Sequence, residues 1–140
     1  MKKLIFSSLI LSLAFAFTAK AQHSIADNIT QTPPKILYKK TFNSKGLKNQ
    51  EVQIVMVPFA PGEVSGAHRH PVETIAYVLE GEIESTFNGK VHRYKQGDVF
   101  YEDPNLLHAE SKNLSKTKNA KLLVFFIGNS GKPYIIPASH

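Results

Sequence analysis

The sequence contains no cysteine among its 140 residues. This absence excludes disulfide bonds, iron–sulfur clusters, thiolate nucleophiles and structural zinc sites built from cysteine. The fold must therefore be held together by a closed hydrophobic core, and a bound metal ion or self-association are the supplements still available to it.

The sequence also lacks an apolar run long enough to span a bilayer. Its longest uncharged stretch covers residues 4–19, which is 16 residues and shorter than the roughly 20 that a membrane-spanning helix needs. The stretch follows two lysines and ends at Ala19-Lys20-Ala21, which is typical of a secretory signal peptide with an A-x-A cleavage site. We expect residues 1–21 to be removed on export, so that the protein is periplasmic or secreted.

Acidic residues are fewer than basic ones, with 11 Asp plus Glu against 17 Lys plus Arg and a formal net charge of +6. The predicted signal peptide holds three of the lysines and no acid, so the rest of the chain has 14 basic and 11 acidic residues, a net charge of +3. Such a small excess predicts neither a nucleic-acid partner nor a membrane partner after cleavage. The lysine-rich segment 111–121 has no apolar period and is predicted to be a solvated loop.

Several catalytic and cofactor-binding motifs are missing. The sequence has no alternation of strand and helix patterns, and no glycine-rich phosphate loop, so a Rossmann-type nucleotide site is excluded. It also has no G-x-S-x-G, no H-E-x-x-H and no convincing pair of carboxylates for glycoside hydrolysis.

Short runs of β-branched and aromatic residues, separated by turn residues, make up most of the chain after Pro34. The runs are 36–38, 52–59, 74–79, 83–87, 91–94, 99–101, 122–127 and 134–136. Asn88-Gly89 separates two of them and predicts a type I′ hairpin. Many short strands at close spacing predict an all-β sandwich or barrel. We assign residues 22–49 to a leader and first strand, and residues 50–140 to the barrel domain.

His68 and His70 are separated by one residue, which places both side chains on the same face of an extended strand, about 6 to 7 Å apart. Two imidazoles in this arrangement can share one metal ion, although a polar exposed loop has the same pattern. The other histidines are weaker candidates. His92 is predicted to be a cross-strand partner on the surface, and His23 and His140 are predicted to be solvated.

The two histidines lie in a block that begins at Gly62 and ends at Gly81, and a second block runs from Gly97 through Pro104 to His108. The two blocks resemble the two sequence motifs of the cupin superfamily. The similarity extends over about residues 50–127. Asn105 replaces a glycine of the second motif, and asparagine tolerates the left-handed backbone angles of such a turn.

The resemblance implies a double-stranded β-helix, which is a jelly-roll barrel of two sheets. It also implies one divalent transition metal bound by the residues that match the family's ligands, which are His68, His70 and His108. Imidazole ligands suit Zn, Mn, Fe, Ni or Cu, and the metal identity stays open.

The carboxylate ligand of the family has no exact counterpart. The matching position is Thr74, and the nearest acid, Glu73, lies one residue earlier. A shift of one residue turns a side chain to the opposite face of a strand, but a bulge at Pro71 would return Glu73 to the metal side. We include Glu73 in the predicted metal site, with Glu102 or a three-histidine site completed by solvent as the alternatives.

These features predict a metal-dependent oxygenase that acts on a small organic molecule. The alternatives are a non-catalytic barrel that binds or senses a small ligand, and an isomerase that uses a histidine as general base without metal. The resemblance and the apolar segment 134–136 also predict a homodimer.

Overall fold

The computed structural model describes residues 33–138 and builds them into ten β-strands, with no helix in that range. The predicted signal peptide, His23 and His140 lie outside the described residues. In the part of the chain that is described, no helix is long and apolar enough to cross a membrane.

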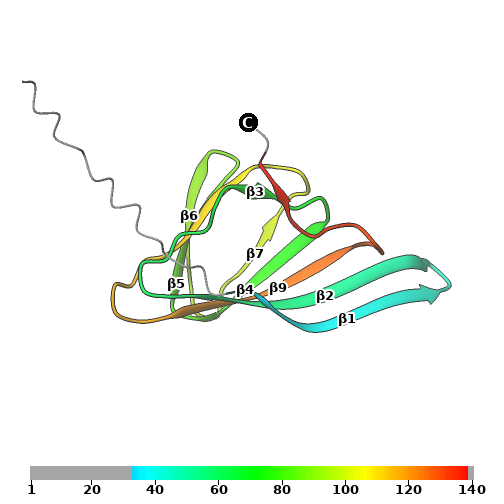
Figure 1. The fold of residues 1–140 in the computed structure, drawn as a ribbon, viewed down its shortest axis with the longest axis horizontal. Helices are drawn as coiled ribbons and strands as arrows, with labels where there is room; N and C mark the ends of the chain where they lie inside the picture. Colours follow the sequence, from blue (N-terminus) through cyan, green and yellow to red (C-terminus); the bar gives the residue numbers. More distant parts are fainter. Residues whose placement is uncertain (1–32, 139–140) are drawn as a thin grey trace, which may run out of the picture.

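Two five-stranded antiparallel sheets form the walls of the barrel (Figure 1). The first sheet has the order β1-β2-β9-β4-β7. Its strands are β1 (Lys35–Ser44), β2 (Leu47–Phe59), β9 (Ala120–Asn129), β4 (Glu73–Glu80) and β7 (Val99–Glu102).

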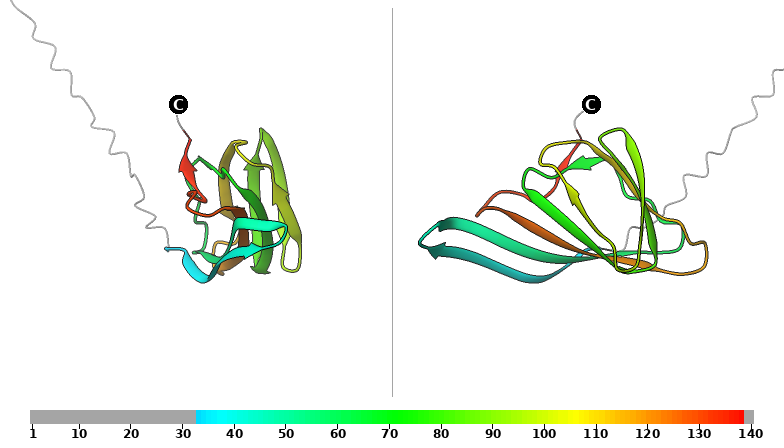
Figure 2. Two further views of the ribbon diagram at one scale, coloured as in Figure 1. Left: turned by 90° about the vertical axis from the view of Figure 1, so that its right-hand side faces the viewer. Right: turned by 180° about the vertical axis from the view of Figure 1, so that it is seen from behind.

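The second sheet has the order β10-β3-β8-β5-β6. Its strands are β10 (Ile136–Pro137), β3 (His68–Arg69), β8 (His108–Asn113), β5 (Glu82–Phe87) and β6 (Lys90–Lys95). Figure 2 shows β10, next to the C terminus, lying beside β3 at one edge of this sheet. The predicted all-β, double-stranded β-helix architecture is confirmed.

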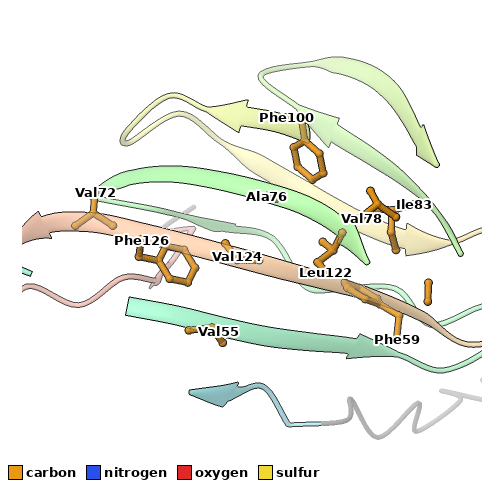
Figure 3. Packing of buried hydrophobic residues seen from close by; sticks show 11 residues of the cluster. Val55, Phe59, Val72, Ala76, Val78, Ile83, Phe100, Leu122, Val124 and Phe126 are labelled. Carbon is orange, nitrogen blue, oxygen red and sulfur yellow. The ribbon is translucent and has the colours of Figure 1, made fainter. Parts of the chain in front are cut away.

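Alternation of side chains directs one face of each central strand into the barrel. On β4, Thr74, Ala76 and Val78 are buried, while the residues between them are more exposed. β9 follows the same period of two. Figure 3 shows the resulting core between the strands. Its members are Val55, Phe59, Val72, Ala76, Val78, Ile83, Phe100, Ala120, Leu122, Val124 and Phe126.

The chain passes from the first sheet to the second at Gly81, the one residue between β4 and β5. Gly81 has a φ of +78°, and a Cβ there would lie 2.9 Å from the Asn119 carbonyl oxygen. No residue type other than glycine fits both the positive φ and the limited space at this position. The predicted hairpin between β5 and β6 is also present, because Asn88 and Gly89 both have positive φ.

The β1–β2 hairpin is longer than the apolar runs predicted. Strand β1 has 10 residues and β2 has 13, and Figure 1 shows the hairpin extending beyond the second sheet. Its outer half is mostly polar and contributes no residue to the hydrophobic core, so strand pairing rather than burial maintains it. Apolar periodicity alone could not detect that half.

The prediction of a solvated loop over 111–121 is wrong at its two ends. Ser111 and Asn113 end β8 with exposed fractions of 2% and 0%, and Ala120 begins β9 and is fully buried. The Asn113 side chain donates to the Ala60 and Lys118 carbonyl oxygens, at 2.9 and 2.8 Å. Backbone carbonyls that need a donor thus explain a buried polar side chain that no apolar pattern reveals.

Candidate metal centre

Three histidines meet on the inner face of the second sheet. His68 on β3 pairs directly with His108 on β8, and His70 follows β3 by one residue. One ring nitrogen from each lies within 4.8 Å of the others. The predicted grouping of His68, His70 and His108 is therefore present in the structure, because cross-strand register brings the two sequence motifs together.

Backbone carbonyls orient the first two rings. Nδ1 of His68 lies 2.8 Å from the Gly66 carbonyl oxygen, and Nδ1 of His70 lies 2.6 Å from that of Tyr134. A carbonyl oxygen only accepts, so each Nδ1 carries the proton, and in a neutral ring the Nε2 lone pair is then free. The two Nε2 atoms approach to 3.2 Å. Two lone pairs at this distance require a proton or a metal ion between them.

A turn in the second motif holds the backbone of His70. Asn105 has a φ of +65°, and its N–H donates to the His70 carbonyl oxygen at 2.7 Å. The Arg69 guanidinium donates to the Asn105 carbonyl oxygen at 2.6 Å. The expectation that asparagine adopts the left-handed conformation here is confirmed.

Glu102, at the end of β7 in the first sheet, is the acid that faces the histidines. Its carboxylate is buried, with Oε2 at 3.4 Å from His70 Nε2 and Oε1 at 3.2 Å from His108 Nδ1. Burial alone raises the pKa of Glu102, but the adjacent imidazoles of His108 and His70 lower that pKa to about 2. The carboxylate is therefore ionised at neutral pH.

Glu73 lies outside the cluster. Strand β4 keeps its regular alternation from its first residue, so Thr74 points inward and is 1% exposed, while Glu73 is exposed on the outer face. The Glu73 carboxylate accepts a hydrogen bond from the Tyr101 hydroxyl. No bulge returns it to the histidines, and the acid beside them is the alternative one, Glu102.

His108 presents the clearest sign of a missing partner. Its Nε2 lies 3.1 Å from the Ser85 hydroxyl oxygen and 3.0 Å from that of Ser111. Its Nδ1 is buried and has no hydrogen bond of acceptable geometry, although it faces Glu102. A metal ion among these groups would satisfy Nδ1 of His108, the two Nε2 atoms and the carboxylate together.

His68 is neutral at physiological pH. Burial, together with the charges of His108 and His70, lowers the pKa of His68 to about 4, although the Gly66 carbonyl opposes this shift. A metal displaces a proton from imidazole only at a cost, and Nε2 of this neutral ring has no proton to displace. The residues present thus fit a divalent metal bound by three imidazoles and one carboxylate.

A cavity of about 420 Å³ lies between the sheets and reaches the histidines. β2 and β9 contribute apolar side chains to its wall, and the segment 134–137 also lines it. The volume falls within the range of roughly 300–1,000 Å³ that is usual for small-molecule sites. The cluster therefore lies where a bound organic molecule could reach it.

The remaining candidate among the described residues, His92, is not part of the histidine cluster. His92 on β6 is exposed, pairs with Ser85 across the hairpin and stacks on Tyr94, as a surface cross-strand residue does. Ser85, Ser111 and the Tyr134 carbonyl were not identified from the sequence. Serine spacing and backbone atoms carry no pattern that would reveal a contact with histidine.

Similar solved structures support the fold. KdgF from Halomonas sp. is 22% identical, with a TM-score of 0.54, and the match covers 69% of this chain and 79% of that one. An uncharacterised protein with a double-stranded β-helix domain from Klebsiella pneumoniae is 18% identical, with a TM-score of 0.61 over 80% of this chain and 88% of that one. These two similarities show the architecture alone.

An oxalate oxidase structure is 29% identical, with a TM-score of 0.52 over 62% of this chain. This chain spans 46% of that protein's length. No curated protein matches the sequence significantly. The family described as the Cupin domain matches residues 55–126, which includes all three histidines and Glu102. The chain therefore belongs to the cupin family.

Proposed function

We propose that this cupin binds one divalent transition metal through His68, His70, His108 and Glu102, and that it acts as a metal-dependent oxygenase on a small organic molecule. The observation that carries the proposal is the cluster of three imidazoles beside the Glu102 carboxylate at the wall of an apolar cavity, in which the buried Nδ1 of His108 has no hydrogen-bond partner. The likeness to an oxalate oxidase, at 29% identity, also supports oxidative chemistry.

The metal would supply Lewis acidity and redox chemistry where the histidines line the cavity. The protein's own contribution is positional. The Gly66 and Tyr134 carbonyls fix two rings, and the Glu102 carboxylate offsets one positive charge of the ion. The apolar wall keeps water away from the substrate and so limits side reactions.

Metal analysis of protein purified without a histidine tag tests the metal site. We expect about one equivalent per chain in the wild type and a loss of most of it in the His68→Ala and His108→Ala variants. The His92→Ala variant, at an exposed position of the edge strand β6, serves as the matched control and should retain the metal. Negligible metal in the wild type, or equal content in all variants, would refute the proposal.

Oxygen consumption with a panel of diols and enols then tests the catalytic part. A metal-loaded protein that consumes oxygen with at least one of these compounds supports an oxygenase. The second candidate is a non-catalytic binding cupin, favoured by the absence of lysine and arginine from the cavity wall among the described residues. Saturable binding without oxygen consumption across the panel would support that alternative.

Export remains part of the proposal because of the signal-peptide pattern in residues 1–21. Expression of the full chain in a bacterial host, followed by N-terminal sequencing of the protein outside the cytoplasm, is expected to give a chain that begins at Gln22. A full-length chain found only in the cytoplasm would contradict export.

A further inference from the structure

The wall of the large cavity is apolar and carries no positive side chain. Val55, Val57 and Phe59 line it from β2, and Leu122, Val124 and Phe126 line it from β9. Neither lysine nor arginine occurs among the described residues that line it, and Glu102 is the one acid. Any negative charge on a ligand must therefore be neutralised at the histidine end.

The charge available there is limited. A divalent ion with three neutral imidazoles and the ionised Glu102 carboxylate has a net charge of +1. One negative charge on a ligand brings the buried site to neutrality. A second negative charge would stay unpaired against valine, leucine and phenylalanine side chains, where a charge is strongly unfavourable.

The shape of the cavity leads to the same class of ligand. Its volume of about 420 Å³ extends from the histidines along two strands of apolar side chains. A molecule as small as oxalate would leave most of that surface unfilled. A ligand with an apolar body would bind more tightly for each methylene group that it buries against the wall.

We infer that the cavity selects molecules with a single oxygen-anion head, such as a monocarboxylate or enolate, joined to an apolar body, and that it rejects small dianions. This inference rests on the proposed metal site and deepens it. It separates this chain from the oxalate oxidase to which its structure is similar, because oxalate is a dianion without an apolar body.

Isothermal titration calorimetry of the metal-loaded protein tests the inference with four probes: acetate, butyrate, hexanoate and succinate. Butyrate and succinate have the same number of carbons and differ by one carboxylate, so they isolate the effect of charge. We expect butyrate to bind at least about tenfold more tightly than succinate, and hexanoate at least about tenfold more tightly than acetate. Equal or tighter binding of succinate, or equal binding of acetate and hexanoate, would overturn the inference.

The Ala76→Leu variant checks that the ligand body lies in the cavity. Ala76 faces the cavity from β4, so a larger side chain should weaken hexanoate several-fold and leave acetate nearly unchanged. Tyr77→Phe, on the outer face of the same strand, is the matched control and should change neither affinity. Hexanoate affinity unchanged by Ala76→Leu would place the body elsewhere and refute the inference. If the Ala76→Leu variant does not fold, the affinities of the wild-type protein for the four carboxylates still test the inference.

Metal content, measured before each titration, distinguishes a failure of the proposed metal site from a failure of the inferred ligand class. A protein without metal fails the proposed function, and the inference fails with it. A protein that holds metal but prefers succinate keeps its metal site and loses only the inferred ligand class.

Discussion

Glu102 and the histidines reach the site from opposite sheets. Glu102 ends β7 in the first sheet, whereas His68 and His108 pair within the second. The carboxylate lies 3.4 Å from His70 Nε2 and 3.2 Å from His108 Nδ1, so it can neutralise an ion that the imidazoles hold. Among the described residues that line the cavity, Glu102 is the one acid.

The Glu102→Gln variant should therefore bind metal at least about tenfold more weakly than the wild type, because the amide keeps the shape and removes the charge. Competition with a chromophoric chelator measures the change. Glu73→Gln, on the outer face of β4, is the control and should leave metal affinity unchanged. A loss of affinity in the Glu73 variant, with none in the Glu102 variant, would reverse the assignment.

The metal-free protein should lose stability on acidification. The pKa of His68 falls from its usual 6.5 to about 4 in the fold, so the unfolded chain binds more protons between these values and stability decreases as pH falls through that window. The pKa of Glu102 falls from 4.5 to about 2, which stabilises the fold above pH 4.5 and is lost as pH falls towards 2. Both shifts therefore lower the free energy of unfolding as the pH falls.

Urea unfolding of the metal-free protein at several pH values checks this expectation. The His68→Asn variant should show a flatter dependence of the free energy of unfolding between pH 6.5 and 4 than the wild type. The exposed His92→Asn variant should retain the wild-type slope. Identical slopes for His68→Asn and the wild type would show that burial does not perturb this histidine.

The sequence predicted the three histidines at residue level, but it offered Glu102 only as an alternative to Glu73. His68, His70 and His108 occur at recognisable spacings, whereas Glu102 is one of several acids whose orientation depends on strand register. Thr74 pairs with Glu102 across β4 and β7, so the two side chains share one face. A carboxylate from the neighbouring strand thus lies where Thr74 offers none, and only the strand pairing reveals it.

At the scale of elements, the segment after β9 shapes the site. The Tyr134 carbonyl accepts from His70 Nδ1, the Tyr134 ring stacks on Phe126, and β10 pairs with β3. The segment therefore forms a wall of the cavity and also orients His70, which is a proposed metal ligand.

Removal of residues 134–140 should lower metal affinity about 10- to 100-fold, because His70 loses the acceptor that orients its ring. The Tyr134→Ala variant keeps the carbonyl and loses only the ring, so it should retain most of the affinity while the cavity widens. Chelator competition measures both. Equal losses in the two variants would assign the effect to the Tyr134 ring instead.

Prediction of the strands succeeded where apolar residues alternate or gather. The runs at 74–79, 83–87 and 122–127 match β4, β5 and β9. The short strand β3 and the strand β8 escaped prediction, because histidine, arginine, serine and asparagine fill them. Those polar strands carry the site, so the elements that bear the chemistry were the hardest to predict from apolar pattern alone.

At the scale of the whole molecule, β1 lies at an edge of the first sheet, and no strand within residues 33–138 pairs with its outer side. Ile36, Leu37 and Tyr38 at its start are each nearly half exposed. An unpaired edge with exposed apolar side chains favours pairing with another chain.

The segment 134–136, from which a homodimer was predicted, packs within its own chain, because Ile136 pairs with Arg69 and the Tyr134 ring stacks on Phe126. The proposed homodimer should therefore form through β1. Light scattering at high concentration is expected to show a dimer for the wild type and a monomer for Leu37→Lys, because a charge on the edge opposes pairing. Leu79→Lys changes an apolar residue of similar exposure on a different strand, and should remain dimeric. A monomeric wild-type protein at high concentration would refute the proposed homodimer.

An ion bound by both sheets would also act on the lifetime of the protein. In a fold without disulfides, His68, His70 and His108 on one side and Glu102 on the other would become a cross-link that closes only when metal is present. Digestion by a nonspecific protease should be several-fold slower with metal than after chelation, and Glu102→Gln should reduce that protection. Metal supply would then govern how long each molecule survives, as well as how many are active.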